Sequence, residues 1–301
     1  MANGKARPSK IERIDLHQRI TDQILSCLGQ GDRPWLPRWR KSAGPVSRPL
    51  RHSGEAYRGI NILLLWAKAV ERDFASPTWM TFRQALELGG HVRRGETGTM
   101  VVYADTIVRT DTDDHGEDVE RRIPFLKSYT VFNLDQIDDL PARFRQPAPI
   151  RDDTQRIAAA ERFFAASGIA VDHGGNEAYY APALDRIQLP PFGAFVDAEA
   201  YYATLAHEAV HATGHPSRVG RELSARCGED AYAREELIAE LGAAFLCADL
   251  GLSLEPRADH VRYLDHWLAI LADDKRFIVA AAAHAQRAAD WLHARQPDPP
   301  G

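Results

Sequence analysis

Residues 201–215 read YYATLAHEAVHATGH, and this stretch decides the fold of the C-terminal half of the chain. His207 and His211 are four residues apart, so on a helix both imidazoles lie on one face, one turn apart. Glu208 lies beside them, where its carboxylate can reach a metal-bound water without binding the metal itself. This is the HExxH arrangement, in which two histidines bind zinc and the glutamate accepts a proton.

The residues around the motif indicate that this helix is buried. Apolar side chains flank the histidines on more than one side of the helix: Tyr201, Tyr202, Leu205, Ala206, Ala209 and Val210. Buried neutral histidines need polar partners, and a shared metal ion is one such partner. The alternative is a solvated amphipathic helix whose histidines bind nothing.

A catalytic zinc site needs a third protein ligand, because zinc takes three protein ligands and leaves one position for water. Gly214 matches the glycine of the longer HExxHxxGxxH pattern, but the residue where that pattern has its last histidine is Ser217. His215 is near this position and out of register. The third ligand is therefore better sought elsewhere in the chain.

A later stretch, AREELIAELGAAF at 233–245, offers Glu235, Glu236 and Glu240. Zincins with a glutamate ligand take it from a second helix, where a group four residues later supports a ligand histidine. Glu236 and Glu240 have this spacing, so we expect Glu236 to bind the metal and Glu240 to support a histidine. Glu240 and His215 remain alternatives for the third ligand. Gly242 suits close packing of two helices. Two histidines and a glutamate predict Zn²⁺, and they also accept Mn²⁺ or another divalent transition metal.

The two halves of the chain differ in charge. The 301 residues carry a net charge of −5, yet residues 1–104 hold 17 basic against 9 acidic side chains. Residues 146–301 hold 14 basic against 23 acidic side chains. This difference indicates that the N-terminal half binds a polyanion and that the C-terminal half has another role.

The pattern of elements predicts an α+β protein with two domains. Helical periodicity marks 11–31, 60–74 and 81–90, and the apolar runs 100–110 and 122–134 predict a hairpin across an acidic turn. We expect an N-terminal domain at 1–140, a Pro-rich linker at 141–153 and a zincin-like metallopeptidase domain at 154–301. Residues 185–190, DRIQLP, are expected to form the sheet edge that lines the zincin cleft, where an extended peptide could add.

Cations and aromatic rings in the N-terminal half predict a surface for single-stranded nucleic acid, which is held by charge along its backbone and by rings under its bases. Trp66 is expected in the core. No helix-turn-helix or zinc-finger pattern is present, which argues against base-specific reading of a duplex. The candidate contacts are Trp35, Trp39, Arg51, Tyr57, Arg58, Arg93, Arg94, Lys127 and Tyr129.

The sequence indicates a cytoplasmic protein that makes no membrane contact. No apolar run reaches the ~18 residues of a membrane span, and the first residues lack the apolar stretch of a signal peptide. Cys27, Cys227 and Cys247 are far apart and form no CxxC pair. We therefore expect buried free thiols rather than disulfides or a structural zinc site.

Several blocks together resemble a known family. SGEAYRGINILLLW, GGHVRRGETGTMVVY, DRIQLP, YYATLAHEAVHATGHPSR and YAREELIAELGAAFL occur in this order. They resemble the ArdC-type antirestriction proteins of conjugative plasmids, and the N-terminal stretch is also similar to TraC-type primases. The resemblance spans about residues 10–290. It implies an N-terminal domain that binds single-stranded DNA, a C-terminal metallopeptidase-like domain, and protection of incoming plasmid DNA from host restriction during conjugation.

Three functions remain open at this point. The first is an antirestriction protein that binds single-stranded DNA and carries a metal site. The second is a DNA-guided metallopeptidase, with Glu208 as general base, that cleaves a host restriction enzyme or another protein. The third is a non-catalytic zincin module that sequesters a restriction subunit.

Overall fold

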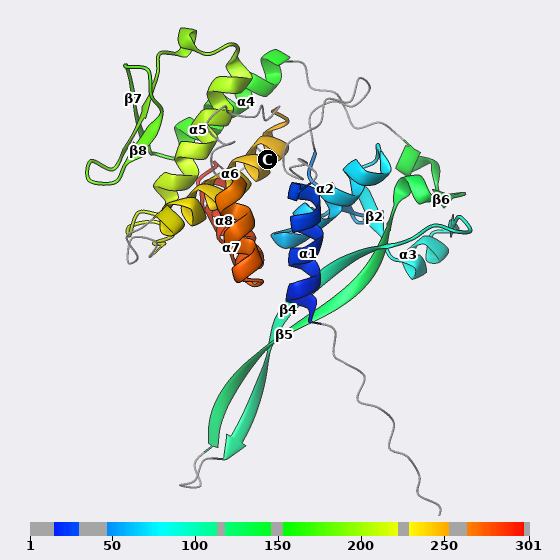
Figure 1. The fold of residues 1–301 in the computed structure, drawn as a ribbon. Helices are drawn as coiled ribbons and strands as arrows, with labels where there is room; N and C mark the ends of the chain where they lie inside the picture. Colours follow the sequence, from blue (N-terminus) through cyan, green and yellow to red (C-terminus); the bar gives the residue numbers. More distant parts are fainter. Residues whose placement is uncertain are drawn as a thin grey trace, which may run out of the picture.

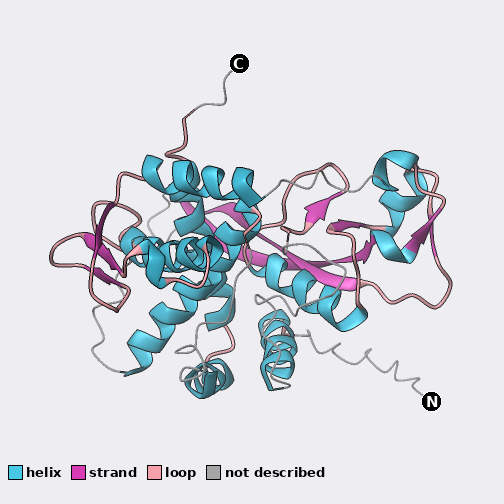
Figure 2. Cartoon of the chain, turned by 90° about the horizontal axis from the view of Figure 1, so that it is seen from above, coloured by secondary structure: helices cyan, strands magenta, loops and turns pink. Residues whose placement is uncertain are grey.

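The computed structural model describes residues 15–29, 47–112, 118–145, 153–221, 229–252 and 264–297. Helices of the C-terminal half gather on one side of the molecule, and a sheet with a long hairpin lies on the other (Figures 1 and 2). The α+β class expected from the sequence is confirmed by this segregation of helices and mostly antiparallel strands. Within the described segments, no helix is long and apolar enough to cross a membrane.

The N-terminal half is built on a four-stranded sheet in the order β1-β2-β5-β4. β1 and β2 are parallel, and the other neighbours are antiparallel. The long strands β4 and β5 form the predicted hairpin, whose far end extends beyond the body of the molecule (Figure 1). The strands are β1 (Leu50–Arg51), β2 (Thr78–Met80), β4 (Thr99–Thr112) and β5 (Asp118–Asn133).

Two helices share the main hydrophobic core with this sheet. They are α1 (Leu16–Gly29) and α2 (Ile60–Arg72). The Asn61 side chain of α2 donates to the Val102 carbonyl (2.8 Å) and accepts from the Val102 amide (2.7 Å), which pairs both backbone groups of this residue of β4. Shorter elements surround a second small core of Met80, Ala85, Ile137 and Leu140. These elements are α3 (Phe82–Glu87), β3 (His91–Val92), β6 (Ile137–Asp138) and the 3₁₀ helices η1 (Leu134–Gln136) and η2 (Ala142–Arg145).

The C-terminal half combines helices with a small sheet in the order β7-β9-β8. The strands are β7 (Ala170–His173), β8 (Tyr179–Ala181) and β9 (Arg186–Leu189), followed by the 3₁₀ helix η3 (Phe192–Ala194). The helices are α4 (Asp153–Ala166), α5 (Ala198–Thr213), α6 (Glu229–Leu250), α7 (Leu264–Asp273) and α8 (Phe277–His293).

The expectation that residues 185–190 form a sheet edge is wrong. β9 lies in the middle of its sheet, parallel to β7 on one side and antiparallel to β8 on the other. Because both rows of its backbone groups are already paired, an extended peptide cannot add to β9. The edges of this sheet are β7 and β8.

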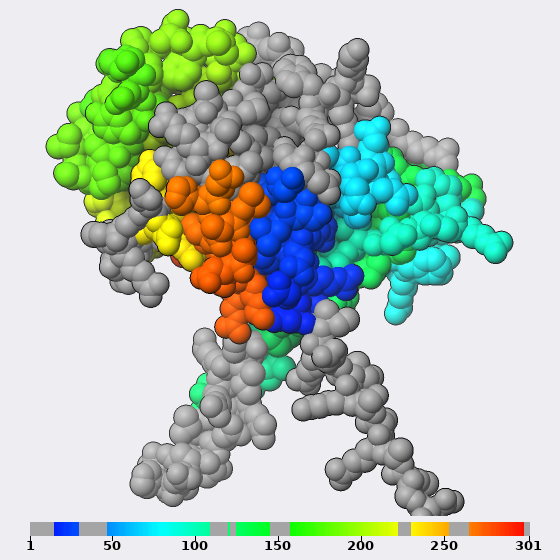
Figure 3. Space-filling model, viewed as in Figure 1, coloured from blue at the N-terminus to red at the C-terminus, as the bar shows by residue number. Residues whose placement is uncertain are grey.

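The two halves share one hydrophobic core. Trp66 of α2 packs against Phe245 of α6, with ring centroids 6.1 Å apart. Arg48 binds Asp249 of α6 through two hydrogen bonds of 2.8 and 2.9 Å, and its guanidinium lies 4.9 Å from the centre of the Phe245 ring. On the surface, α1 adjoins α7 (Figure 3). Residues 146–152 of the expected linker lie outside the described segments.

Helices α5 and α6 approach each other closely because α6 has a glycine at the contact. A Cβ atom added at Gly242 would lie 2.6 Å from Val210 Cγ2 and 2.9 Å from Val210 Cγ1. Such distances are shorter than any ordinary contact, so only glycine permits this separation of the two helices. The expectation that Gly242 suits close helix packing is confirmed.

We predict that Gly242→Ala lowers the free energy of unfolding. Overpacking a core costs about 1–3 kcal/mol, and the better helix propensity of alanine offsets up to ~1 kcal/mol of that cost. Chemical denaturation monitored by circular dichroism measures the change. Gly193→Ala is the control, since no atom lies within 4 Å of a Cβ added there. Equal stability of the two variants would contradict the close contact.

Candidate metal centre and nucleic-acid surface

Helix α5 lies inside the protein, as its apolar surroundings predict. Its N-cap is Asp197, whose carboxylate accepts a hydrogen bond from the Ala200 amide at 2.7 Å. Every residue from 201 to 210 is buried, so the helix has no solvated face along this stretch. His207 and Glu208 are 4% and 3% exposed. The alternative of a solvated helix with idle histidines is therefore excluded.

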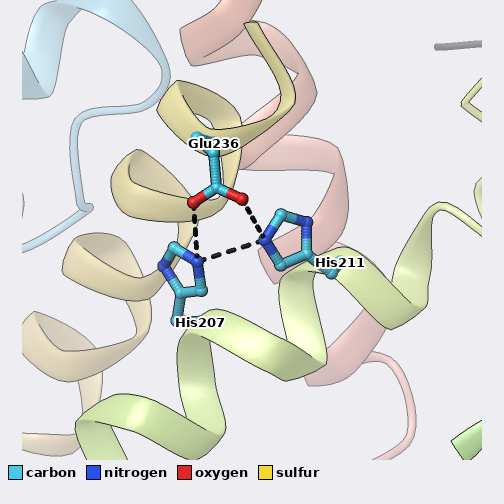
Figure 4. Close-up of side chains that lie close together, drawn as sticks. All are labelled: His207, His211 and Glu236. Carbon is cyan, nitrogen blue, oxygen red and sulfur yellow. Dashed lines mark hydrogen bonds and ion pairs between the residues drawn. The ribbon is translucent and has the colours of Figure 1, made fainter. Parts of the chain in front are cut away.

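His207, His211 and Glu236 point toward one another across the contact between α5 and α6 (Figure 4). The two histidine Nε2 atoms are 3.1 Å apart. Glu236 Oε2 lies 3.4 Å from His207 Nε2, and Glu236 Oε1 lies 3.4 Å from His211 Nε2. The sequence predicted that these three residues converge, and the structure confirms it.

The separations of these donor atoms fit a metal ion. Ligands about 2.0–2.1 Å from a tetrahedral zinc are about 3.3 Å from one another, and the observed separations are 3.1–3.4 Å. Two imidazole nitrogens and a carboxylate oxygen are a donor set that zinc and manganese both accept. A zinc ion held by three protein ligands supplies Lewis acidity, which lowers the pKa of a water molecule to about 7.

The charges around the three residues favour a cation between them. Burial opposes a charged imidazolium at His211, yet hydrogen bonds to Glu235 and Glu236 outweigh burial and raise the pKa of His211 to about 10. Burial likewise opposes ionisation of Glu236, but its hydrogen bonds to His207 and His211 hold the pKa of this carboxyl far below its usual value. The two carboxylates thus hold a proton on His211, and a divalent metal ion would take the place of this proton between the same groups.

One residue that supports the site was not predicted in this role. Glu235 Oε1 lies 3.2 Å from His211 Nδ1 and accepts a hydrogen bond from the N–H group there. His211 Nε2 is therefore the ring nitrogen left to bind the metal. Glu235 was only one of three candidate glutamates in the sequence. Its contact depends on how α6 is rotated against α5, and the spacing of residues does not reveal that rotation.

The remaining candidates around the motif have distinct positions. Glu240 is 2% exposed and lies one turn after Glu236, and its support of a ligand histidine stays a prediction. His215 is half-buried and makes a hydrogen bond of 2.7 Å with Ser217 Oγ. It is not a member of the metal-binding group. The role of Glu208 as a general base stays a prediction.

Part of the expected nucleic-acid surface forms a continuous stripe on one face of the β4–β5 hairpin, which we call the aromatic stripe. Tyr103 lies opposite Lys127, Val101 opposite Tyr129 and Asp105 opposite Phe125, so alternate side chains share one face. Tyr103 and Tyr129 are 48% and 50% exposed. Lys127 Nζ lies 4.9 Å from the centre of the Phe125 ring. The aromatic stripe consists of Tyr103, Phe125, Lys127 and Tyr129.

Tyr103 and Phe125 were missed as candidates. The signal was present, because alternation along a hairpin strand places every second residue on one face. The pairing of Tyr103 with Lys127 depends on the register, however, and the length of the hairpin turn was not fixed by the sequence. The register became known only from the structure.

The expectation of an open stacking ring at Tyr57 is wrong. The side chain is 7% exposed and belongs to the hydrophobic core, and the Arg51 guanidinium lies 5.5 Å from the centre of its ring. The glycine-flanked turn resembles a surface loop in sequence, but it packs inward. Trp66 lies in the core as expected, where its indole N–H donates to the Ser47 carbonyl. Trp35 and Trp39 lie outside the described residues.

Several candidate arginines are already engaged in ion pairs. Arg58 pairs with Asp290 of α8, and Arg51 pairs with Glu55 at 3.3 Å. Arg93 pairs with Glu96 at 3.0 Å and with Asp138 at 3.4 Å. Arg94 is exposed next to Arg93. These arginines lie outside the β4–β5 hairpin that carries the aromatic stripe, and their role in nucleic-acid binding stays a prediction.

Two family models match the chain, one in each half. Residues 14–132 match the N-terminal domain of the anti-restriction factor ArdC. Residues 158–284 match a zincin-like metallopeptidase family. The second match contains His207, His211 and Glu236.

Two solved structures are similar to this chain over nearly its whole length. Both are crystal structures of the antirestriction protein ArdC from plasmid R388, one metal-free and one bound to Mn(II). Each is 44% identical to this chain and covers 94% of it, with TM-scores of 0.79 and 0.78. This chain covers 98% of the metal-free protein and 99% of the manganese-bound one.

Curated relatives extend the similarity. The uncharacterized protein y4eC of Sinorhizobium fredii is 43% identical over 290 residues, which cover 94% of this chain and 93% of y4eC. A DNA primase TraC of Escherichia coli is 36% identical over 92% of this chain, which spans only 27% of the primase. A second Escherichia coli TraC is 33% identical, and the chain spans 20% of it.

We predict that His207→Ala removes stoichiometric binding of Zn²⁺ and Mn²⁺, because the metal loses a protein ligand. Loss of a group that only supports a ligand costs about 10- to 100-fold in affinity, so loss of a ligand is expected to cost more. Isothermal titration calorimetry on protein stripped of metal gives the affinity. His215→Ala is the matched control and should bind metal like the wild type. Retained binding in His207→Ala, or its loss in His215→Ala, would contradict the assignment.

Proposed function

Because this chain belongs to the ArdC family of antirestriction proteins, we propose that it binds single-stranded DNA and protects incoming plasmid DNA from host restriction. In this proposal the N-terminal half holds the DNA and the C-terminal half holds Zn²⁺ or Mn²⁺. The match to the ArdC N-terminal domain supports the first part, and the donor set of His207, His211 and Glu236 supports the second.

The aromatic stripe is the observation that carries the DNA-binding proposal. Rings packed in a core are hidden from solvent, whereas the rings of Tyr103 and Tyr129 are about half exposed on a strand pair that projects from the body. Bases stack on exposed rings without sequence preference, and lysine contacts the phosphates between them. A stripe with alternating rings and a cation therefore suits unpaired DNA, whose bases are free to stack.

One acid lies on the same face and fixes a ring of the stripe. The Tyr103 hydroxyl donates to Asp105 Oδ2 at 2.7 Å, which orients the phenol ring along the hairpin. This hydrogen bond also lowers the pKa of Asp105, so the carboxylate is ionised at neutral pH. Its negative charge opposes phosphate, so Asp105→Asn is expected to strengthen binding while it keeps an acceptor for Tyr103.

We predict that Tyr103→Ala and Tyr129→Ala each weaken the binding of single-stranded DNA by about 1–3 kcal/mol, the usual cost of a lost stacking ring. Lys127→Ala should reduce the slope of log affinity against log salt by about 0.7, since one phosphate contact is lost. Fluorescence anisotropy with a labelled oligothymidylate at several salt concentrations measures both effects.

Tyr179→Ala is the matched control for the ring variants. Tyr179 is 48% exposed on β8 in the C-terminal half, so this variant removes a comparably exposed ring that lies outside the aromatic stripe. Its affinity for the oligonucleotide should equal that of the wild type. Equal weakening by Tyr179→Ala, or no weakening by the stripe variants, would overturn the location of the DNA site.

A metallopeptidase activity is the second candidate function. Three protein ligands are the set typical of catalytic rather than structural zinc sites, and Glu208 lies next to the ligand His207. In this function the Glu208 carboxylate would accept a proton from the attacking water, and the metal ligands would hold the ion in place. The peptide substrate would be a protein bound near the DNA.

We predict that Glu208→Gln abolishes any proteolysis and leaves metal binding intact, because glutamine keeps the shape of the side chain and cannot accept the proton. The experiment compares how strongly plasmid DNA delivered by conjugation is restricted in the presence of the wild type and of the Glu208→Gln variant. Loss of protection would support the peptidase. Undiminished protection would rule out cleavage as the basis of antirestriction. Ordered metal with no product in a proteome-wide digest would favour the module that sequesters a restriction subunit.

A further inference from the structure

Arg221 is a buried arginine next to the metal centre whose role no sequence motif explains. Its side chain is 1% exposed. At the C-terminal end of α5 it donates from Nη2 to the Val210 carbonyl and from Nη1 to Thr213 Oγ1, both at 2.6 Å. A buried guanidinium has five donors to satisfy, and these two contacts leave the rest available for another partner.

That partner is Glu235. Arg221 Nη2 lies 2.7 Å from Glu235 Oε1, and Nε lies 3.4 Å from Oε2. Glu235 Oε1 also lies 3.2 Å from His211 Nδ1. The carboxylate is therefore held between the guanidinium and the imidazole, and a row of three side chains leads from Arg221 to the ligand atom of His211.

Gly214 leaves the space that the guanidinium occupies. A Cβ atom added at Gly214 would lie 3.0 Å from the His211 carbonyl oxygen, 3.1 Å from Arg221 Nη2 and 3.4 Å from Arg221 Cζ. The backbone of Gly214 is right-handed helical, with φ −68° and ψ −16°, so its conformation does not require glycine. The glycine seven residues after His207, which the HExxHxxG pattern singled out, therefore makes room for a side chain here.

We propose that Arg221 is a positioning residue of the metal centre, which holds Glu235 against His211 Nδ1 so that His211 Nε2 faces the metal. The ring of a histidine ligand keeps one orientation and one tautomer only while its other nitrogen has a fixed acceptor. Glu235 extends from a different helix and is 20% exposed, so without Arg221 its carboxylate can turn toward solvent. This inference rests on the metal centre and not on DNA binding.

A double-mutant cycle tests the proposal on the full chain. The variants are Arg221→Met, Glu235→Gln and the two together, and the readouts are the affinity for Zn²⁺ by chelator competition and the visible absorption spectrum of bound Co²⁺. Glu235→Gln should weaken metal binding by about 10- to 100-fold. If Arg221 acts through Glu235, Arg221→Met weakens it too, and the double variant binds no more weakly than Glu235→Gln alone.

Three further variants separate positioning from a purely structural role. Thr213→Val removes one contact of Arg221 with α5 and keeps the contact with Glu235, so it should lower stability without changing the Co²⁺ spectrum. Arg221→Lys keeps the charge and should restore part of the affinity lost in Arg221→Met. Gly214→Ala crowds both the guanidinium and the His211 carbonyl and should alter the Co²⁺ spectrum in a folded protein, so an unchanged spectrum in this variant contradicts the proposal even if Arg221→Met does not fold.

Two results would overturn the proposal. One is wild-type metal affinity and an unchanged Co²⁺ spectrum in Arg221→Met or Gly214→Ala. The other is full additivity of the Arg221 and Glu235 effects on metal affinity, which would mean that the two side chains act independently. Failure of DNA binding would leave the proposal untouched, because none of these variants lies on the aromatic stripe.

Discussion

The contact between α5 and α6 at Val210 and Gly242 is the constraint on which the metal centre depends. Two of the three donor side chains come from α5 and the third from α6, so the distance between the helix axes sets the distance between the donors. A side chain at 242 would push the helices apart, and a shift of a few tenths of an ångström is comparable to the tolerance of a metal–ligand bond. The small residue on α6 is thus as much a part of the site as the ligands are.

Helix α6 also joins the metal centre to the N-terminal half. Glu235 and Glu236 lie in its first half, whereas Phe245 and Asp249 in its second half contact Trp66 and Arg48. The pair of Arg48 and Asp249 is buried enough that loss of either partner would leave an uncompensated charge. The zincin-like helices and the sheet that carries the aromatic stripe therefore pack as one body, although their families are matched separately.

Local patterns in the sequence were enough to predict the hairpin and the three metal ligands. Features that depend on contacts between distant segments could not be predicted in this way. The spacing of His207 and His211 and the later Glu236 are features of single helices, and the apolar runs of β4 and β5 showed their hairpin directly. The central place of β9 depends on which strands pair, and the burial of Tyr57 depends on what packs over its turn. The contacts of Glu235 with His211 and Arg221 link three separate segments, so spacing alone could not reveal them.

X-ray absorption spectroscopy of the protein loaded with one equivalent of Zn²⁺ is the decisive experiment for the three-residue metal centre. We expect a first coordination shell of only nitrogen and oxygen at about 2.0–2.1 Å, with the outer-shell scattering of two imidazole rings. A sulfur ligand at about 2.3 Å, or scattering from fewer than two imidazoles, would contradict a metal centre formed by His207, His211 and Glu236.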